Sequence, residues 1–152
     1  MKSPDEKILL LKAERFCAYR ERCTYEIKQK LRELGADENT GAKIISSLTE
    51  DEYLNDERFA KLFASGKFRI KRWGKNKIRA GLRLKKIPDN FIWNALDAID
   101  EAAYMETLHH LAEKKGKEVK SKNTREKNQK IGMFLLSRGF ESELIWKALK
   151  ST

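Results

Sequence analysis

Residues Gly81 to Leu96, GLRLKKIPDNFIWNAL, recur 53 positions later as residues Phe134 to Leu149, FLLSRGFESELIWKAL. Apolar residues keep their places in the two stretches, whereas most polar residues change. The matching pairs are Ile78 and Ile131, Leu82 and Leu135, Ile87 and Phe140, Ile92 and Ile145, Trp93 and Trp146, Ala95 and Ala148, and Leu96 and Leu149. A repeat that preserves apolar spacing predicts two copies of one structural unit with one pattern of core residues.

The N-terminal third of the chain follows the same plan with a shorter first part. Glu14 to Phe16 correspond to Glu57 to Phe59 at an offset of 43, and Ile27 corresponds to Ile78 at an offset of 51. Three such small units either pack on one another or form an elongated, curved row, and we favour the row. The sequence therefore predicts an all-α protein of three tandem three-helix repeats, over residues 1–53, 54–100 and 101–152. A chain that ends near Asp100 is expected to remain folded.

Capping residues, glycines and prolines divide each unit into three predicted helices. Ser3-Pro4-Asp5-Glu6 resembles a capping box and opens a helix that ends near Arg22, and Thr24 is predicted to cap the next helix. Asn55 and Asp89 are the predicted caps of two helices in the second unit. The predicted helices cover about residues 4–22, 24–35, 38–47, a stretch from 56, 75–88, a stretch from 89, 101–115, 125–138 and 142–150, with a loop over 116–124.

Positive charge is concentrated in two blocks of the sequence. Residues Phe59 to Pro88 hold eleven Lys or Arg and no Asp or Glu, and Lys114 to Lys130 hold eight basic residues against two acidic ones. The chain as a whole has a net charge of +10, so the remaining residues are acidic on balance. The first block also carries apolar residues at helical spacing, namely Phe59, Leu62, Phe63, Ile70, Ile78 and Leu82. This pattern indicates a folded surface that binds nucleic acid or a nucleoprotein, the alternative being a Lys-rich solvated helix face.

Several other classes of protein are disfavoured. No apolar run exceeds four residues, which argues against a transmembrane helix or a secretory signal, so we expect a cytoplasmic protein with no membrane partner. Cys17 and Cys23 fall on one predicted helix and are interpreted as reduced thiols. His109 and His110 are adjacent, and a helix points them about 100° apart, so no metal ligand set is expected.

No catalytic constellation is found. Gly66-Lys67 is not a phosphate loop, because Lys61 stands at the position of the first Gly and Phe68 at that of the Ser or Thr that binds magnesium. The carboxylates between Glu50 and Glu57 straddle a predicted helix boundary, where acidic residues serve as caps. The sequence therefore predicts a protein that is not an enzyme and has no cofactor.

The three tryptophans differ in their surroundings. Trp93 and Trp146 occupy the same repeat position and are predicted to be core or packing residues. Trp73 lies among cations, in the stretch Arg69 to Lys75. An aromatic ring in that setting either stacks on an unpaired base, at ~1–3 kcal/mol per base, or covers the small core of its unit, and both interpretations stay open.

Two motifs in the middle of the chain carry a family resemblance. Tyr53 to Ala60, YLNDERFA, matches an aromatic-Leu-Asp-Asp-x-Arg-Phe-Ala string, except that Asn55 replaces the first Asp. Trp73 to Ile78, WGKNKI, followed by Leu82, matches a Gly and a basic-Ile-x-x-x-Leu helix that ends near Gly-Ile, except that Lys86 replaces this Gly. In these motifs and in its three repeats, essentially the whole chain resembles the family of the bacterial regulatory protein RecX.

The resemblance implies a non-enzymatic modulator of the RecA recombinase, active in DNA repair, recombination and the SOS response. Such a protein lies along the groove of the RecA filament on single-stranded DNA and inhibits its ATPase, strand exchange and coprotease activities. We accordingly expect a monomer whose partners are the RecA filament and single-stranded DNA, with duplex DNA left open. The residues predicted to contact DNA or RecA are Lys67, Arg69, Lys71, Arg72, Trp73, Lys75, Lys77, Arg79 and Arg83.

Two alternatives compete with this interpretation. The first is a plain helical DNA-binding module in which the helix from Lys75 to Lys86 enters a major groove. That helix offers mainly Lys and Arg, with Asn76 as its only amide. The second is a nucleotide-processing enzyme, which the missing catalytic site disfavours.

Overall fold

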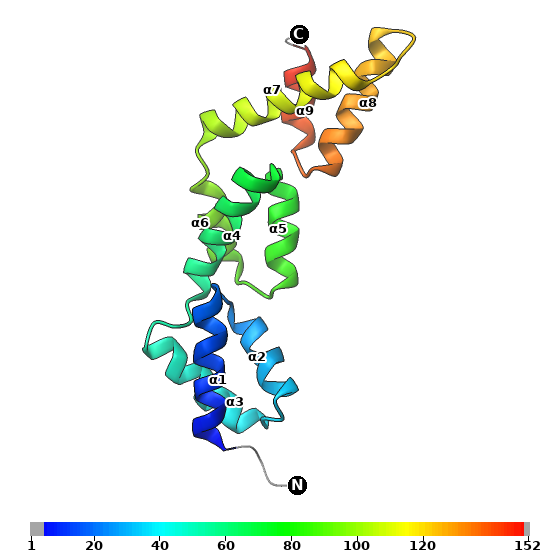
Figure 1. The fold of residues 1–152 in the computed structure, drawn as a ribbon. Coiled ribbons are helices and arrows are strands. Elements are labelled where there is room, and N and C mark those ends of the chain that lie inside the picture. Colours follow the sequence, from blue (N-terminus) through cyan, green and yellow to red (C-terminus); the bar gives the residue numbers. More distant parts are fainter. Residues whose placement is uncertain (1–4, 151–152) are drawn as a thin grey trace.

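The computed structural model describes residues 5–150, which form nine α-helices and no strand (Figure 1). The helices are α1 (Glu6–Tyr19), α2 (Thr24–Glu33), α3 (Glu38–Glu50), α4 (Asp56–Lys71), α5 (Lys75–Leu84), α6 (Asp89–Asp97), α7 (Glu101–Glu118), α8 (Thr124–Ser137) and α9 (Ser142–Lys150). Helices pack mainly in threes, so we name α1–α3 unit 1, α4–α6 unit 2 and α7–α9 unit 3. The units follow one another in an elongated, curved row. The all-α class and the three tandem repeats are therefore confirmed, while the domain limits given above stay a prediction.

Side-chain caps fix where several helices begin. The Asn55 side chain accepts a hydrogen bond of 2.9 Å from the N–H of Arg58, so this cap of α4 is confirmed. Asp5 caps α1 in the same way, and the predicted contribution of Ser3-Pro4 lies outside the described residues. These bonds satisfy N–H groups that have no partner within a helix.

Two other predicted caps are wrong by one residue. Thr24 is the first residue of α2 and Cys23 is its N-cap, with the Cys23 N–H donating to Glu26 Oε1 at 3.2 Å. Asp89 is likewise the first residue of α6, and Pro88 is the N-cap. Proline suits this place because its backbone is extended there (φ −58°, ψ 143°) and a residue before the helix needs no N–H.

Several helix ends also differ from prediction, because α3 continues to Glu50 and α5 ends at Leu84, and the ends of α1 and α7 differ as well. Helix α1 ends at Tyr19, because Arg22 folds back and its Nε donates to the Phe16 carbonyl at 3.1 Å. The Arg22 guanidinium then lies 3.6 Å from the Phe16 ring centre. Helix α7 continues to Glu118, which shortens the loop to residues 119–123. Ion pairs at i, i+3 and i, i+4 spacing support these last turns of α7.

The two cysteines do not share a helix, contrary to prediction. Cys17 lies in α1 and Cys23 precedes α2. Both are free, as predicted, and both are buried. Burial raises the pKa of the Cys23 thiol to about 11.

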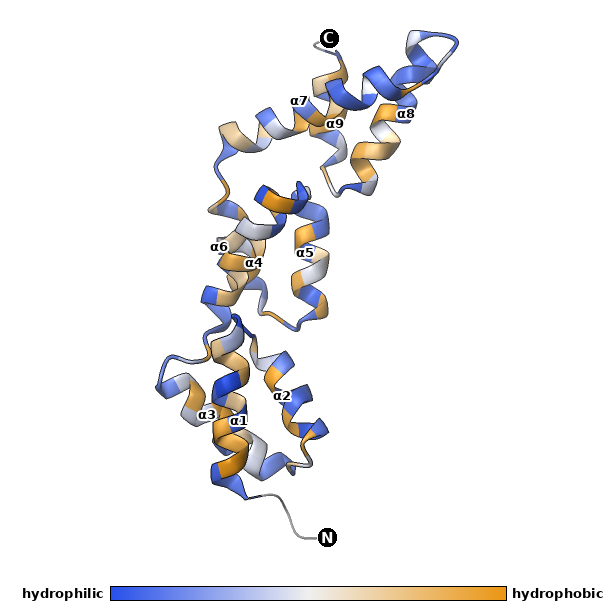
Figure 2. Ribbon diagram, viewed as in Figure 1, coloured by the Kyte–Doolittle hydropathy of each residue, from blue (hydrophilic) through white to orange (hydrophobic). Residues whose placement is uncertain are grey.

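The apolar core has two parts, and the helices of all three units carry hydrophobic as well as hydrophilic stretches (Figure 2). Unit 1 has its own core, formed by Leu9, Ala13, Cys17, Ile27, Leu31, Ile44, Leu48 and Leu54. Units 2 and 3 share one continuous core, which includes every apolar repeat pair predicted from the sequence apart from the tryptophans. On α4 the side chains of Phe59, Ala60, Ala64 and Phe68 are buried. Leu62 and Ile70, predicted to belong to this apolar face, are 55% and 76% exposed.

Units 2 and 3 meet through their backbones. The N–H of Gly74 donates to the Arg138 carbonyl at 2.8 Å, and the N–H of Asn76 donates to the Gly139 carbonyl at 2.9 Å. Donors at the start of α5 thus satisfy carbonyls at the end of α8, two sets of groups that have no partner within their own helices. A side-chain carbon on Gly74 would collide with the Gly139 backbone, so this approach requires glycine.

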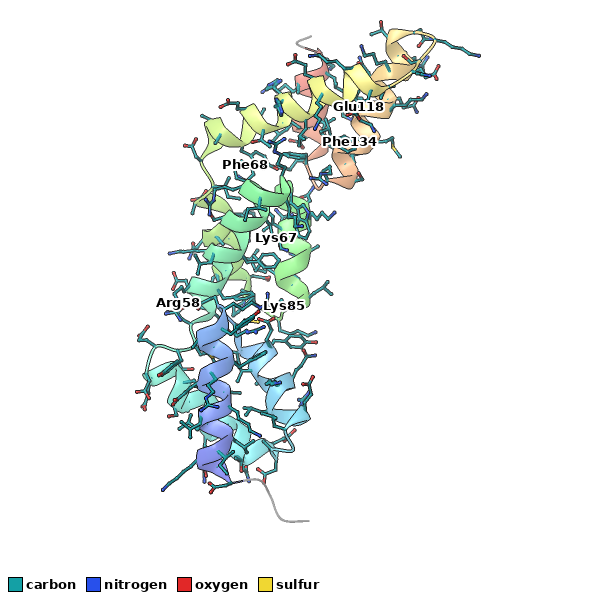
Figure 3. All side chains as sticks on the ribbon, in the orientation of Figure 1. Arg58, Lys67, Phe68, Lys85, Glu118 and Phe134 are labelled. Carbon is teal, nitrogen blue, oxygen red and sulfur yellow. The ribbon has the colours of Figure 1, made fainter. Side chains whose placement is uncertain are left out.

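Units 1 and 2 meet through polar side chains instead. The contacts are Thr24 N to Asp56 Oδ1 (2.7 Å), Arg58 Nε to Glu21 Oε1 (2.7 Å) and Lys85 Nζ to Glu26 Oε2 (3.3 Å). Figure 3 shows Arg58 and Lys85 at this boundary. Buried Cys23 reaches across it as well and belongs to the core of units 2 and 3.

The turn after the second helix of each unit has the same form. Gly35 and Gly139 adopt left-handed conformations there, with φ of 88° and 97°. Lys86 occupies the equivalent place in unit 2 with φ of 58°. The unusual Lys86 therefore preserves the turn geometry that glycine provides in the other two units.

Candidate nucleic-acid interface

Eight of the nine predicted contact residues are basic, and they come from two consecutive helices. Four lie at the end of α4 and its C-cap, and four lie on α5. They are Lys67, Arg69, Lys71, Arg72, Lys75, Lys77, Arg79 and Arg83. Within residues 5–150 none of these eight side chains forms an ion pair with a carboxylate at 4.0 Å or less. Their charge is therefore available to an external anion.

Trp73, the ninth predicted residue, is half-buried between two of these lysines. Its ring packs edge-on against Phe63, with ring centres 6.4 Å apart, and belongs to the rim of the core. Lys67 Nζ lies 4.9 Å and Lys77 Nζ 4.8 Å from the ring centre. Trp73 thus covers the core of unit 2, as one of its two interpretations required, and also positions two cations.

A second group of cations lies on the other flank of α5. Arg79 stacks on Trp93 at 5.7 Å and donates to Asn76 Oδ1 at 3.1 Å. Lys75 Nζ lies 5.0 Å from the Tyr104 ring centre. Helical geometry explains the split, because positions 75 and 79 share a side of a helix and position 77 points away from both. Four of the predicted cations consequently form two pairs, Lys67 with Lys77 and Lys75 with Arg79. The other four, Arg69, Lys71, Arg72 and Arg83, are exposed, and Arg69 Nε donates to Ser65 Oγ at 3.1 Å.

Trp93 and Trp146, predicted to be core or packing residues, are not core residues. Their side chains are 64% and 42% exposed. Trp146 does pack against a neighbour, because a side-chain carbon added to Gly132 would touch its ring. The repeat therefore preserves an exposed aromatic position together with the buried ones.

The second cationic block is partly neutralised. Lys115, Lys117 and Lys130 each pair with a glutamate at 3.2 to 4.0 Å. Its other basic residues, Lys114, Lys120, Lys122, Arg125 and Lys127, form no such pair within the described residues. Sequence reasoning missed that Arg138 lines the same pocket as Arg72, because the two residues are far apart in sequence and come together only where the end of α8 reaches the end of α4.

Two further features of the described residues bear on chemistry. Residues 5–150 contain no cluster of three or more His, Cys, Asp or Glu arranged to hold a metal ion. In the same range, no helix has the length and apolar character needed to cross a membrane.

The fold and the repeat pattern define a protein built from tandem three-helix domains. Three domain families match in order: the first, second and third three-helix domains of RecX match residues 10–48, 55–96 and 102–149. The chain belongs to the RecX family of regulatory proteins.

Individual relatives agree with this assignment. The regulatory protein RecX of Prosthecochloris aestuarii is 31% identical over 149 residues, covering 98% of this chain and 96% of the relative. That of Chlorobaculum tepidum is 34% identical, covering 82% of this chain and 76% of the relative. That of Clostridium tetani is 34% identical but covers 83% of this chain and 56% of the relative, so the chain spans little more than half of that protein. The crystal structure of RecX from Lactobacillus salivarius superposes with a TM-score of 0.89 at 26% identity, covering 96% of this chain and 95% of that one.

Proposed function

We propose that this protein is a modulator of the RecA recombinase that binds along the RecA filament on single-stranded DNA and inhibits it by occupancy. The observation that carries the proposal is the set of eight basic side chains without carboxylate partners, in the middle of an elongated row of three units. A filament on DNA is long and rich in phosphate, which suits both the shape and the charge. In this proposal the protein acts as a cytoplasmic monomer and catalyses no reaction.

Three linked units favour a polymeric partner. Once one unit is bound, the next meets its site at a high effective concentration, so weak individual contacts add up along the filament. Groove binding of this kind blocks the ATPase, strand exchange and coprotease activities without a catalytic site. Suppression therefore depends on the span of the molecule as well as on its charge.

The rival is a plain helical DNA-binding module that inserts α5 into a major groove. Recognition helices read bases through the residues of their first turn. The backbone of that turn of α5 is covered by the end of α8, and the amide oxygen of Asn76 accepts from Arg79. These contacts favour binding to phosphates over reading of bases.

The proposal is tested by measuring ATP turnover of RecA on single-stranded DNA with and without the full chain. We expect suppression by the natural sequence and much weaker suppression by the double variant Lys71→Glu with Arg83→Glu, two exposed cations of unit 2. Lys12→Glu with Lys43→Glu is the matched control, because it makes the same charge change on exposed residues of unit 1. Unchanged RecA turnover with the natural sequence would refute the proposal.

A further inference from the structure

A pocket at the junction of units 2 and 3 joins the two cationic blocks. It has a volume of about 240 Å³. Its lining comes from the end of α4, from α7 and from the end of α8, and consists of Arg72, Leu111, Lys114, Lys115, Glu118, Phe134 and Arg138. Four basic residues thus face one carboxylate. Glu118 and Phe134 mark the α7 and α8 sides of the pocket in Figure 3.

The single carboxylate leaves most of this charge unpaired. Glu118 lies 4.0 Å from Lys115, and both side chains are partly exposed. In the described part of the chain, Arg72, Lys114 and Arg138 form no ion pair with a carboxylate. The pocket therefore attracts an anion from outside the protein.

Arg138 adds a specific donor to this charge. One Nη of its guanidinium donates to the Lys71 carbonyl at the end of α4. Its Nε is buried and has no hydrogen-bond partner among residues 5–150. Buried donors are nearly always satisfied, so an unsatisfied one beside a pocket indicates that a ligand or water completes it. The planar guanidinium fork fits phosphate oxygens in particular.

Arg72 is held in the pocket wall by an unusual backbone. It has φ of 55° and ψ of 42°, the left-handed conformation in which glycine is the favoured residue. An L-residue there costs roughly 1–2 kcal/mol, and such strain is concentrated at functional sites. The protein thus has a cationic residue at a position where glycine would have a lower conformational cost.

A purely structural role accounts for only part of the arrangement. Basic side chains near the ends of α4 and α8 offset the negative ends of the helix dipoles, and Arg138 does so through its bond to Lys71. Lys114 is an exposed residue of α7 that adds positive charge beside the pocket, and Arg138 Nε takes no part in offsetting a helix dipole. The unsatisfied Nε is therefore the group that a structural role does not explain.

We propose that this junction pocket binds a phosphodiester group of a single-stranded nucleic acid. Drug-sized ligands occupy pockets of about 300–1,000 Å³, so this smaller one suits one phosphate of a strand that continues outside. Leu111 and half-buried Phe134 supply an apolar wall beside the sugar. The inference deepens the proposed function and rests on it for the biological setting, since it makes unit 3 a second point of contact with the DNA strand.

The test measures binding of the full chain to a fluorescent single-stranded oligonucleotide at several salt concentrations, without RecA. The variant Arg72→Gly with Lys114→Ala removes two pocket cations, and Arg72→Gly also relieves the left-handed strain, so the melting temperature should not fall. Lys120→Ala with Lys122→Ala removes the same charge from the exposed loop between α7 and α8. We expect the pocket variant to bind at least about tenfold more weakly than the control. The slope of log affinity against log salt concentration should be less steep for the pocket variant than for the control by about 0.7, which is the contribution of one phosphate on a single strand.

Three outcomes would overturn the inference. Equal loss of affinity in the two variants would mean that only net charge matters. Absence of oligonucleotide binding by the natural sequence would mean that the pocket does not bind a nucleic-acid strand. Binding of inorganic phosphate or nucleoside triphosphate that the pocket variant abolishes, with oligonucleotide affinity the same in the natural sequence and in the pocket variant, would assign the pocket to a free phosphate ligand. The binding test contains no RecA, so its result is independent of the proposed function. Oligonucleotide binding that depends on the pocket, together with no effect of the protein in the RecA turnover assay, would refute the proposed function and leave this inference standing.

Discussion

At the scale of single residues, three non-glycine positions have left-handed backbones, and two of them are basic. Among residues 5–150 they are Glu52, Arg72 and Lys86. Lys86 replaces a glycine that the other units retain at the equivalent turn. Its neighbour Ile87 still donates to the Leu82 carbonyl at 3.2 Å, as glycine-containing turns do elsewhere in the chain. The turn is therefore maintained against a steric cost.

Lys86→Gly is expected to stabilise the protein by about 1 kcal/mol, because glycine adopts positive φ without the clash of a Cβ atom. Lys86→Ala is the control, since it removes the same charge and keeps the Cβ, and it should bring no gain. Urea unfolding followed by circular dichroism measures both. Equal stabilisation by the two variants would attribute the effect to charge instead of backbone conformation.

Buried titratable residues make the fold sensitive to alkali, among them Cys17, Cys23 and Tyr104, whose pKa values are all raised by burial. Burial raises the pKa of Cys23 to about 11, from an ordinary value of 9.0. Burial, and then its hydrogen bond to Glu141, raise the pKa of Tyr104 above its ordinary value of 10.0. A raised folded pKa means that each group stabilises the folded state below its ordinary pKa and loses this contribution as the pH rises toward the folded value.

The free energy of unfolding should therefore fall as the pH rises from about 9 toward 11. Cys23→Ala should make this decline shallower, because the variant has no thiol to ionise in the unfolded chain. Tyr104 continues to contribute above pH 10.0, so part of the decline should remain. Denaturant titrations on either side of pH 9.0 give the comparison, and identical pH profiles for the two proteins would contradict it.

At the scale of elements, the family motifs specify the junctions between units. In the first motif Asn55 caps α4, Asp56 accepts from the start of α2, and Arg58 reaches Glu21. In the second, Gly74 starts α5 against the end of α8. The stretches that carry the resemblance thus determine how three otherwise similar units are joined.

Two glycine-to-alanine substitutions distinguish the effect of crowding at the contact between units 2 and 3 from the effect of helix propensity within α4. Gly74→Ala should destabilise the protein strongly, because its new methyl group would collide with the Gly139 backbone, which has no freedom to move aside. Gly66→Ala should stabilise it by about 1 kcal/mol, since that glycine lies in the middle of α4 with open space around it. Thermal unfolding measures both changes. Similar effects of the two substitutions would contradict the tight approach of units 2 and 3.

The sequence predicted the repeats and helices well, because apolar spacing and capping are local signals. It failed where contacts are distant in sequence: Arg138 reaches Lys71 across 67 positions, and Lys75 reaches Tyr104 across 29. It also could not decide whether Trp93 is a core or a packing residue, because a repeat preserves any residue that its units share, whether buried or exposed. The cationic stretch was visible in the sequence, whereas its division into two flanks and a junction pocket required the fold.

At the scale of the whole molecule, the units are not equally independent. Units 2 and 3 share one core, so a chain that ends near Asp100 would expose it and leave donors of α5 unsatisfied. This argues against the expectation that such a chain stays folded. Unit 1 has a separate core and is held to unit 2 largely by polar contacts. The position of unit 1 relative to the rest consequently depends on these polar contacts, including those of Arg58, and on the packing of Cys23 against the core of units 2 and 3.

Arg58→Ala tests whether a rigid span matters for inhibition. The substitution removes the 2.7 Å contact with Glu21 and the bond to the Glu52 carbonyl, at a cost of about 1 kcal/mol for a partly exposed ion pair. The natural chain should show a radius of gyration in X-ray scattering well above the roughly 15 Å of a compact domain of its length. The variant should scatter as a more flexible particle, because unit 1 is less firmly held.

Arg15→Ala is the matched control, because Arg15 is the repeat counterpart of Arg58, is exposed, and changes the charge equally. We expect Arg58→Ala to inhibit RecA several-fold more weakly than Arg15→Ala at equal concentration, while both bind a short single-stranded oligonucleotide alike, because the cationic groups of units 2 and 3 are untouched. A loosened joint lowers the effective concentration of unit 1 at its site on the filament without altering any single contact. If scattering confirms the looser shape and inhibition is nevertheless undiminished, unit 1 is not needed as part of a rigid span. Inhibition would then not depend on a rigid span, and the plain DNA-binding module would gain support.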